Sequence, residues 1–153
     1  MVIYLKKLFI ISLIGIFIDR ITKILVSNID SIVVIKNFFN ITNTHNYGAA
    51  WSILEGYRIL LIIVSIFVLV LIYMIFIKGK KLNNYEIFSY GILISGIIGN
   101  LIDRIIYGYV IDFLDFNILG YNYPVFNIAD SFIVISIILL IIKEFRSDLN
   151  GCR

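Results

Sequence analysis

The chain has 153 residues, of which 61% are hydrophobic and 15% are charged, and its formal net charge is +3 at pH 7. With a mean hydropathy of +1.01, this composition excludes an ordinary soluble globular domain, in which roughly a quarter of the residues are charged. The lysines and arginines lie near the ends of apolar segments, which gives no support to nucleic-acid binding, and one cysteine (Cys152) and one histidine exclude an internal disulfide and a zinc site built from several such ligands.

The first apolar segment runs from about residue 3 to residue 26 and holds Asp19, Arg20 and Lys23 in its second half. Two lysines precede its apolar stretch as in a signal peptide, but no small-x-small cleavage site follows, so we expect a retained transmembrane helix. Asp19 and Lys23 are four residues apart and can form an ion pair. That pair either belongs to a site or only eases the helix into the lipid interface. Arg20 is expected to extend toward the lipid headgroups.

The segment that follows is predicted to contain two short strands. Residues 32–35 and 38–42 are β-branched and aromatic runs flanked by Asn and Asp, a pattern typical of strands. We expect them to form a small extracytoplasmic sheet on the membrane surface, within the first outer loop. His45 is interpreted as a solvated loop residue and not as a catalytic base.

Three further apolar segments, at about residues 59–77, 87–106 and 127–143, complete a predicted bundle of four transmembrane helices. Crossing ~30 Å of hydrocarbon takes about 20 residues, and the last segment is long enough only when Asn127 begins it. Lysines and arginines are concentrated before the first segment, between the second and third, and after the fourth. This bias places both termini in the cytoplasm. The whole chain is expected to be one mainly α-helical membrane domain.

Polar side chains from three of the predicted helices lie at one depth. Counted from the inner end of its helix at 1.5 Å per residue, each of Asp19, Asn100 and Asp130 lies ~20 Å along the axis. An ionisable group in hydrocarbon is costly, and it therefore indicates a functional site. We expect one shared site in the outer part of the bilayer.

Asp112 and Asp130 stand on either side of the second outer loop. Two neighbouring carboxylates can share one proton, which is the requirement for aspartyl-type hydrolysis of a peptide bond. Gly108 is expected to end the third helix, and Asp112 and Asp115 are predicted to project from one short helix or turn, with Asp115 solvated. Asn127 either orients the Asp130 carboxylate, or caps the fourth helix, or does both.

Asn100, Asp103 and Arg104 are three and four residues apart, so they share one face of the third helix. Asp103 is either a member of the site or one half of a salt bridge with Arg104 or Arg20. Helical spacing alone does not choose between Asp103 and Asp112 as the partner of the acidic residue in the fourth helix.

Four motifs in this order resemble those of the lipoprotein signal peptidases, the type II signal peptidases of bacteria. The resemblance covers nearly the whole chain, and its departures touch no polar position. The motifs are Asp19-Arg20-Ile21-Thr22-Lys23, Asn46-Tyr47-Gly48-Ala49-Ala50-Trp51-Ser52, Gly99-Asn100-Leu101-Ile102-Asp103-Arg104 followed by Gly108-Tyr109-Val110-Ile111-Asp112-Phe113, and Phe126-Asn127-Ile128-Ala129-Asp130-Ser131.

The resemblance implies an aspartic endopeptidase of the bacterial cytoplasmic membrane, with Asp112 and Asp130 as its catalytic pair and no metal or cofactor. The implied substrate is a prolipoprotein whose cysteine carries diacylglyceryl, cleaved on the amino side of that cysteine by a monomer surrounded by membrane lipids. The implied supporting or substrate-contacting residues are Asp19, Lys23, Asn46, Asn100, Arg104 and Asn127.

Two other classes of protein are compatible with a polar membrane helix bundle. A small ion-coupled transporter subunit would use Asp19, Asp103 and Asp130 as a relay, but a relay needs carboxylates staggered through the bilayer. A scaffold without activity would not require polar groups matched in depth.

Overall fold

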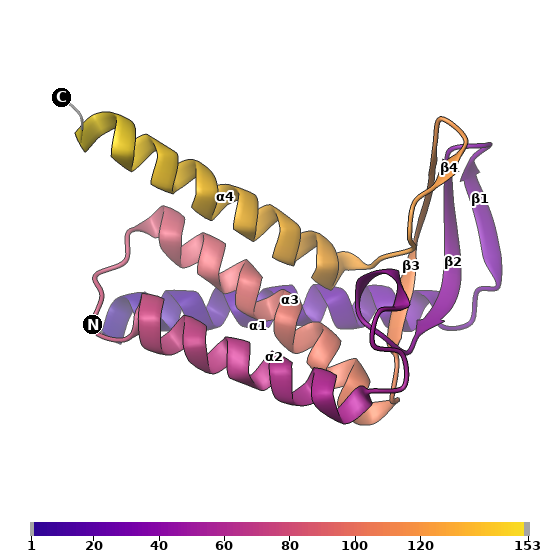
Figure 1. Ribbon diagram of the computed structural model, residues 1–153, viewed down its shortest axis with the longest axis horizontal. Helices are drawn as coiled ribbons and strands as arrows, with labels where there is room; N and C mark the ends of the chain where they lie inside the picture. The colour runs from indigo at the N-terminus through magenta and orange to yellow at the C-terminus, as the bar shows by residue number, and fades with distance from the viewer. Residues whose placement is uncertain (1, 152–153) are drawn as a thin grey trace.

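The computed structural model describes residues 2–151, so Cys152 lies outside the described residues. Within this range, long helices and a small antiparallel sheet make up the fold (Figure 1). The helices are α1 (Val2–Val26), α2 (Arg58–Ile72), which continues as the π-helical turn η2 (Tyr73–Ile77), α3 (Asn84–Ile106) and α4 (Ile128–Gly151), and a single 3₁₀ turn, η1 (Ala50–Ser52), precedes α2. The four predicted helical segments are therefore confirmed as helices.

Helix α3 is the centre of the bundle, because α1 and α4 pack along it most extensively and α2 packs mainly against it. Gly96 allows the close approach of α3 to α4, since a Cβ atom at this position would overlap the carbonyl oxygen of Ala129. The apolar core at the end of the bundle away from the sheet contains Leu8, Ile87 and Leu93. A rigid central helix thus carries the polar residues of its outer end into contact with both neighbours.

In the described part of the chain, two helices are long and apolar enough to cross a membrane, Arg58–Ile77 and Asn84–Ile106. Only 11% of the most apolar stretch of the first is buried inside the protein, which suits a surface that faces lipid. Helices α1 and α4 have 25 and 24 residues, which is also sufficient length, but in both helices charged side chains lie at the two ends of a shorter apolar stretch.

The sheet has the strand order β1-β2-β3-β4 within the described residues, and every neighbouring pair is antiparallel. Strands β1 (Ser31–Ile35) and β2 (Phe39–Asn46) confirm the sheet expected in the first outer loop. The second loop was expected to hold a short helix or turn, and this prediction is wrong. It supplies β3 (Val110–Ile118) and β4 (Tyr121–Asn122), because the β-branched and aromatic residues of β3 pair with the otherwise open edge of β2.

The strand changes the expected relation between two acidic residues. Residues three apart in a strand lie on opposite faces, so Asp112 and Asp115 do not project together. Asp112 is buried opposite Thr44 of β2, whereas Asp115 is half-buried and accepts a hydrogen bond from Nδ2 of Asn40. His45 is exposed, as expected, but it lies in β2 and stacks on Tyr109.

The sheet lies across one end of the helix bundle, while α1 begins and α4 ends at the opposite end (Figure 1). Gly108, with φ of +88°, makes the turn from α3 into β3, as predicted. The backbone N–H groups of Phe113 and Leu114 donate to the carbonyl oxygen of Phe126 at 2.9 and 2.8 Å. These bonds hold the start of β3 beside the first turn of α4, and they bring Asp112 and Asp130 into one region.

Candidate active site

A cavity of about 640 Å³ opens where the sheet meets the helix ends. Asp112 enters it from β3 and Asp130 from the first turn of α4, so residues 18 positions apart in sequence line the same space. The other predicted site residues in its lining are Asn46, Asn100 and Arg104. The depth matching of polar groups on separate helices is thus confirmed for Asn100 and Asp130, since Nδ2 of Asn100 donates to Oδ1 of Asp130 at 2.7 Å.

The Asp112 carboxyl is 2% exposed and receives two side-chain hydrogen bonds. Nδ2 of Asn127 donates to its Oδ1 at 2.6 Å, and Nδ2 of Asn46 donates to its Oδ2 at 2.9 Å. Burial, and then the negative charge of Asp130, raise the pKa of Asp112 to about 7, although the two amide hydrogen bonds and the charge of Lys23 act in the opposite direction. This carboxyl therefore exchanges its proton near neutral pH.

Asn127 joins the two aspartates. Its Oδ1 accepts from the backbone N–H of Asp130 at 2.9 Å, and its own N–H donates to Oδ2 of Asp130 at 3.2 Å. This reciprocal pair is a helix cap of the capping-box kind, while the Nδ2 group of the same side chain contacts Asp112. The capping role considered for Asn127 is therefore confirmed, whereas its side-chain amide contacts the Asp112 carboxylate and only its backbone N–H contacts that of Asp130.

Each amide of the site is held in one orientation by a group that can only donate. The Lys23 ammonium donates to Oδ1 of Asn100 at 3.1 Å, and the Gly48 N–H donates to Oδ1 of Asn46 at 2.9 Å. The Asp130 N–H does the same for Asn127. Since the oxygens are occupied, the NH₂ groups of all three amides must turn toward the carboxylates.

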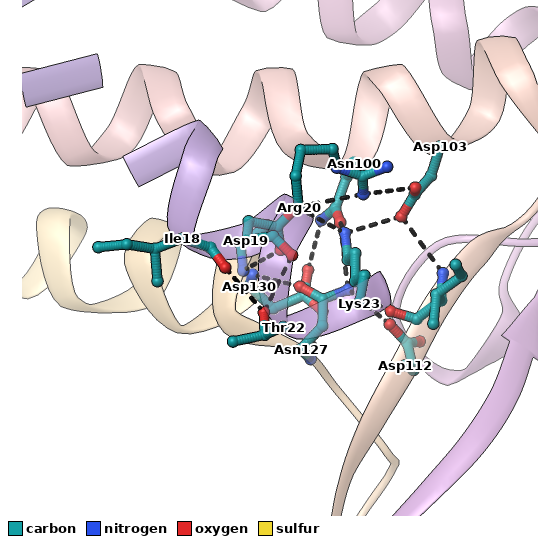
Figure 2. Close-up of polar contacts among 12 residues, drawn as sticks. Ile18, Asp19, Arg20, Thr22, Lys23, Asn100, Asp103, Asp112, Asn127 and Asp130 are labelled. Atoms are coloured by element: carbon teal, nitrogen blue, oxygen red, sulfur yellow. Dashed lines mark hydrogen bonds and ion pairs between the residues drawn. The ribbon is translucent and has the colours of Figure 1, made fainter. Parts of the chain in front are cut away.

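Behind the cavity, two carboxylates and two cations form a buried ion cluster, defined as Asp19, Arg20, Lys23 and Asp103 (Figure 2). Lys23 Nζ lies 3.0 Å from Oδ2 of Asp19 and 2.7 Å from Oδ2 of Asp103. The predicted Asp19–Lys23 pair is confirmed, and both side chains are almost completely buried. Neither lines the cavity, which fits a supporting role and not contact with substrate.

The expectation that Arg20 extends to the lipid headgroups is wrong. Its Nη2 group pairs with Oδ1 of Asp103 and lies 3.3 Å from Oδ2 of Asp19. If Arg20 extended toward lipid, Lys23 would be the one cation left beside the buried carboxylates of Asp19 and Asp103. An unpaired buried charge is strongly unfavourable. The suggested salt bridge between Asp103 and Arg20 is confirmed.

Three comparisons with known proteins agree with this geometry. Residues 11–146 match the family model described as signal peptidase (SPase) II. The lipoprotein signal peptidases of Staphylococcus aureus strains JH9 and Newman are each 41% identical over 154 aligned residues, which cover 95% of this chain and 94% of the relative. The chain belongs to the signal peptidase II family.

Two solved structures extend the likeness to the fold. A bacterial membrane enzyme determined by the in meso method at 2.3 Å resolution has a TM-score of 0.84 and 39% identity, with 92% of this chain and 88% of that chain covered. A second one, at 1.9 Å resolution, has a TM-score of 0.78 and 40% identity, with 88% and 89% covered. This member of the family is therefore a protease with the fold of a bacterial membrane enzyme.

Arg104 and two aromatic residues border the cavity of this signal peptidase. Nη2 of Arg104 donates to the carbonyl oxygen of Gly48 at 2.9 Å, which ties α3 to the loop before α2. In that loop, Trp51 has a left-handed backbone (φ 55°, ψ 29°) and its ring centroid lies 6.3 Å from that of Tyr123. Both rings are more than one-third exposed, so they present apolar surface at the cavity mouth.

The arrangement of the carboxylates argues against the hypothesis of an ion-coupled transporter that uses them as a relay. Asp19 and Asp103 share one lysine and are closed off from the cavity, and Asp130 lies one residue beyond the backbone group that Asp19 binds. These carboxylates are gathered in one region and are not spread along the helices. Among residues 2–151, no three His, Cys, Asp or Glu side chains come together as metal ligands would.

Proposed function

We propose that this protein is an aspartic endopeptidase that removes signal peptides from diacylglyceryl-modified prolipoproteins, cutting before the lipidated cysteine. Asp112 and Asp130 would be the catalytic pair. One observation carries this assignment: Asn127 hydrogen-bonds to both carboxylates, which line the same cavity. The names of the related proteins supply the substrate class.

In the proposed reaction, one carboxylate is ionised and takes a proton from a water molecule, which attacks the scissile carbonyl carbon. The other carboxyl is protonated and donates a hydrogen bond to the carbonyl oxygen. As the peptide bond breaks, the carboxyl that took the proton from water passes it to the leaving amine. Two carboxyls that interact titrate as a coupled pair and lose their protons in separate steps. The pKa of about 7 for Asp112 supports a pair that holds one proton at neutral pH. The mechanism requires neither a metal nor a cofactor.

The proposed position in the membrane has α1, α2, α3 and α4 crossing the bilayer, with both termini in the cytoplasm and the sheet outside. The lysine and arginine bias supports this orientation, as does the location of the helix ends opposite the sheet (Figure 1). The cavity wall continues along α4 through Ile133, Val134 and Ile135. The acyl chains of a substrate would rest on this apolar wall while its peptide bond reaches the carboxyls. We expect the protein to act as a monomer.

Incubation of purified protein with a diacylglyceryl-modified precursor peptide tests the proposal. Cleavage before the modified cysteine is expected, with and without a chelator, and the unmodified peptide is the control. Asp112→Asn and Asp130→Asn should remain folded and lose cleavage. Full activity of either variant, or loss of wild-type activity on chelation, would contradict the proposed chemistry.

A further inference from the structure

We infer that Asp19 and Asp103 are positioning residues, each of which holds the backbone beside one catalytic aspartate. Lys23 pairs with both carboxylates and so connects the two contacts (Figure 2). This inference rests on the proposed function of Asp112 and Asp130. It gives the buried ion cluster a role in the geometry of the catalytic pair beyond the stability of the fold.

The two carboxylates make equivalent contacts. Oδ1 of Asp19 accepts from the backbone N–H of Ala129 at 3.1 Å, and the next residue is Asp130. Oδ2 of Asp103 accepts from the backbone N–H of Ile111 at 3.3 Å, and the next residue is Asp112. The ion cluster therefore reaches the chain immediately before each catalytic residue.

Lys23 connects these two contacts. Its ammonium group has three donors, and its three partners are Oδ2 of Asp19 at 3.0 Å, Oδ2 of Asp103 at 2.7 Å and Oδ1 of Asn100 at 3.1 Å. The third partner, Asn100, in turn donates to Asp130. One fully used cation thus fixes both backbone segments and one of the amides that contact the catalytic pair.

The backbone groups involved are ones that the fold leaves free for such contacts. The N–H of Ala129 lies in the first turn of α4, where a helix provides no internal acceptor. A carboxylate is a strong acceptor for such a group. By contrast, a buried ion cluster is a poor device for stability alone, since apolar replacements of similar volume are often as stable. The contacts of this cluster are therefore better explained by positioning.

Gly99 offers a test that leaves every charged residue in place. A Cβ atom at this position would lie 2.7 Å from Oδ2 and 3.1 Å from Cγ of Asp19, so Gly99→Ala must displace that carboxylate. Gly91 is the matched control, because its Cβ would press on Ile11 of α1, 2.6 Å from Cγ2, without touching the ion cluster. Both variants strain the contact between α3 and α1, and the Cβ atom at Gly99 would also lie 3.2 Å from Cβ of Ala129 in α4.

The measurement is kcat and KM for a lipidated precursor peptide, at a temperature well below the thermal midpoint of each variant. Displacement of a catalytic group by about 1 Å can cost about 100-fold in rate, so kcat of Gly99→Ala should fall about 10- to 100-fold, while KM changes by less than about threefold. Gly91→Ala should lower the thermal midpoint and retain its kcat. Equal losses of kcat in the two variants, or a rise in KM alone for Gly99→Ala, would overturn the inference.

A second comparison removes one cation and one carboxylate together from the ion cluster. Lys23→Met/Asp103→Leu leaves Asp19 and Arg20 as a neutral pair, and it removes the acceptor for Ile111. We expect this double variant to fold and to have a low kcat with nearly unchanged KM. Lys143→Met is the control, because it breaks an ion pair with Glu86 that lies far from the cavity along α4. This variant should have the wild-type kcat. A double variant with wild-type kcat would overturn the positioning role of Asp103 and Lys23.

The outcomes of these two comparisons can be distinguished from a failure of the proposed function. If the catalytic pair is misassigned, Asp130→Asn retains activity, and if the substrate is misassigned, the wild-type protein does not cleave the peptide. Either result overturns the positioning role as well, because it has no catalytic pair to act on. If both assignments hold, Gly99→Ala against Gly91→Ala decides the inference by itself.

Discussion

Asn127 donates a 2.6 Å hydrogen bond to Asp112 from the position that caps the helix of the second catalytic candidate. This one side chain thereby fixes the start of α4 relative to Asp112 in β3. A change at this residue should affect both the stability of the helix and the chemistry of the pair, and the two effects can be separated.

Replacement of Asn127 by serine or alanine makes this separation. Serine is a good helix cap and alanine is not, a difference of about 1 kcal/mol in the free energy of unfolding, so Asn127→Ser should have the higher thermal midpoint. Neither residue can donate the amide hydrogen bond to Asp112, so both variants should lose most of their kcat. Recovery of activity by Asn127→Ser along with stability would show that the side chain acts only as a cap.

The proposed sharing of one proton by Asp112 and Asp130 predicts how cleavage depends on pH. Burial and the charge of Asp130 raise the pKa of Asp112 to about 7, so raising the pH through 7 removes the proton that the reaction needs. We expect kcat/KM to fall above pH 7, since this ratio reports the ionisations of the free enzyme. A rate that stays constant from pH 6 to 9 would contradict a shared proton.

Asn46 should shift this pH profile. Its amide hydrogen bond lowers the pKa of Asp112, against the larger effects of burial and of Asp130. Asn46→Ala should therefore raise that pKa and move the loss of activity to higher pH. Asn122→Ala, which changes an exposed asparagine in β4, is the control and should keep the wild-type profile. A downward shift for Asn46→Ala would show that its hydrogen bond does not favour the ionised carboxyl.

The stability of the fold should depend on pH through the same carboxyl. Because the pKa of Asp112 is about 7 in the fold, above its ordinary value of 3.8, the folded state binds more protons between these limits. The contribution of the Asp112 carboxyl to the free energy of unfolding is then greatest below about pH 4, and it is lost as the pH rises through 7. The thermal midpoint of the wild-type protein in detergent, measured from pH 5 to pH 8, should fall relative to that of Asp112→Asn. Parallel curves for the two proteins would contradict the raised pKa.

The sequence predicted the parts of the site that depend on helix geometry. A constant rise per residue made it possible to place Asn100 and Asp130 at one depth, and their amide and carboxylate are in contact. The i,i+4 spacing of Asp19 and Lys23 likewise predicted their ion pair. Regular helices convert sequence separation into distance, so counting residues was sufficient.

The predictions that failed depend on partners that are distant in sequence. Asp112 and Asp115 were expected to project from one short helix or turn after Gly108, but the open edge of β2 made this segment a strand. For Arg20, spacing within one helix could not choose between lipid headgroups and a salt bridge with Asp103, which comes from α3, 83 residues later. Two cations and two carboxylates in the outer parts of two predicted helices were the signal of a closed ion cluster. Their balance of charge, considered together, would have predicted it.

Trp51 should contribute to substrate binding more than to chemistry. Its ring stands at the cavity mouth, near Tyr123, and is 61% exposed, so in the absence of substrate it presents a large apolar surface to the outside. Burial of an aromatic side chain by a ligand is a common source of affinity, with losses of about 2 kcal/mol or more on truncation. We therefore expect Trp51→Ala to raise KM for the lipidated peptide by about 10-fold or more, with kcat within about threefold of wild type. Trp51→Phe keeps an aromatic ring at this position and should recover most of the affinity. If Trp51→Ala instead lowered kcat and left KM unchanged, the ring would act on the geometry of Asp112 and Asp130, and the cavity mouth would not be the surface that holds the substrate.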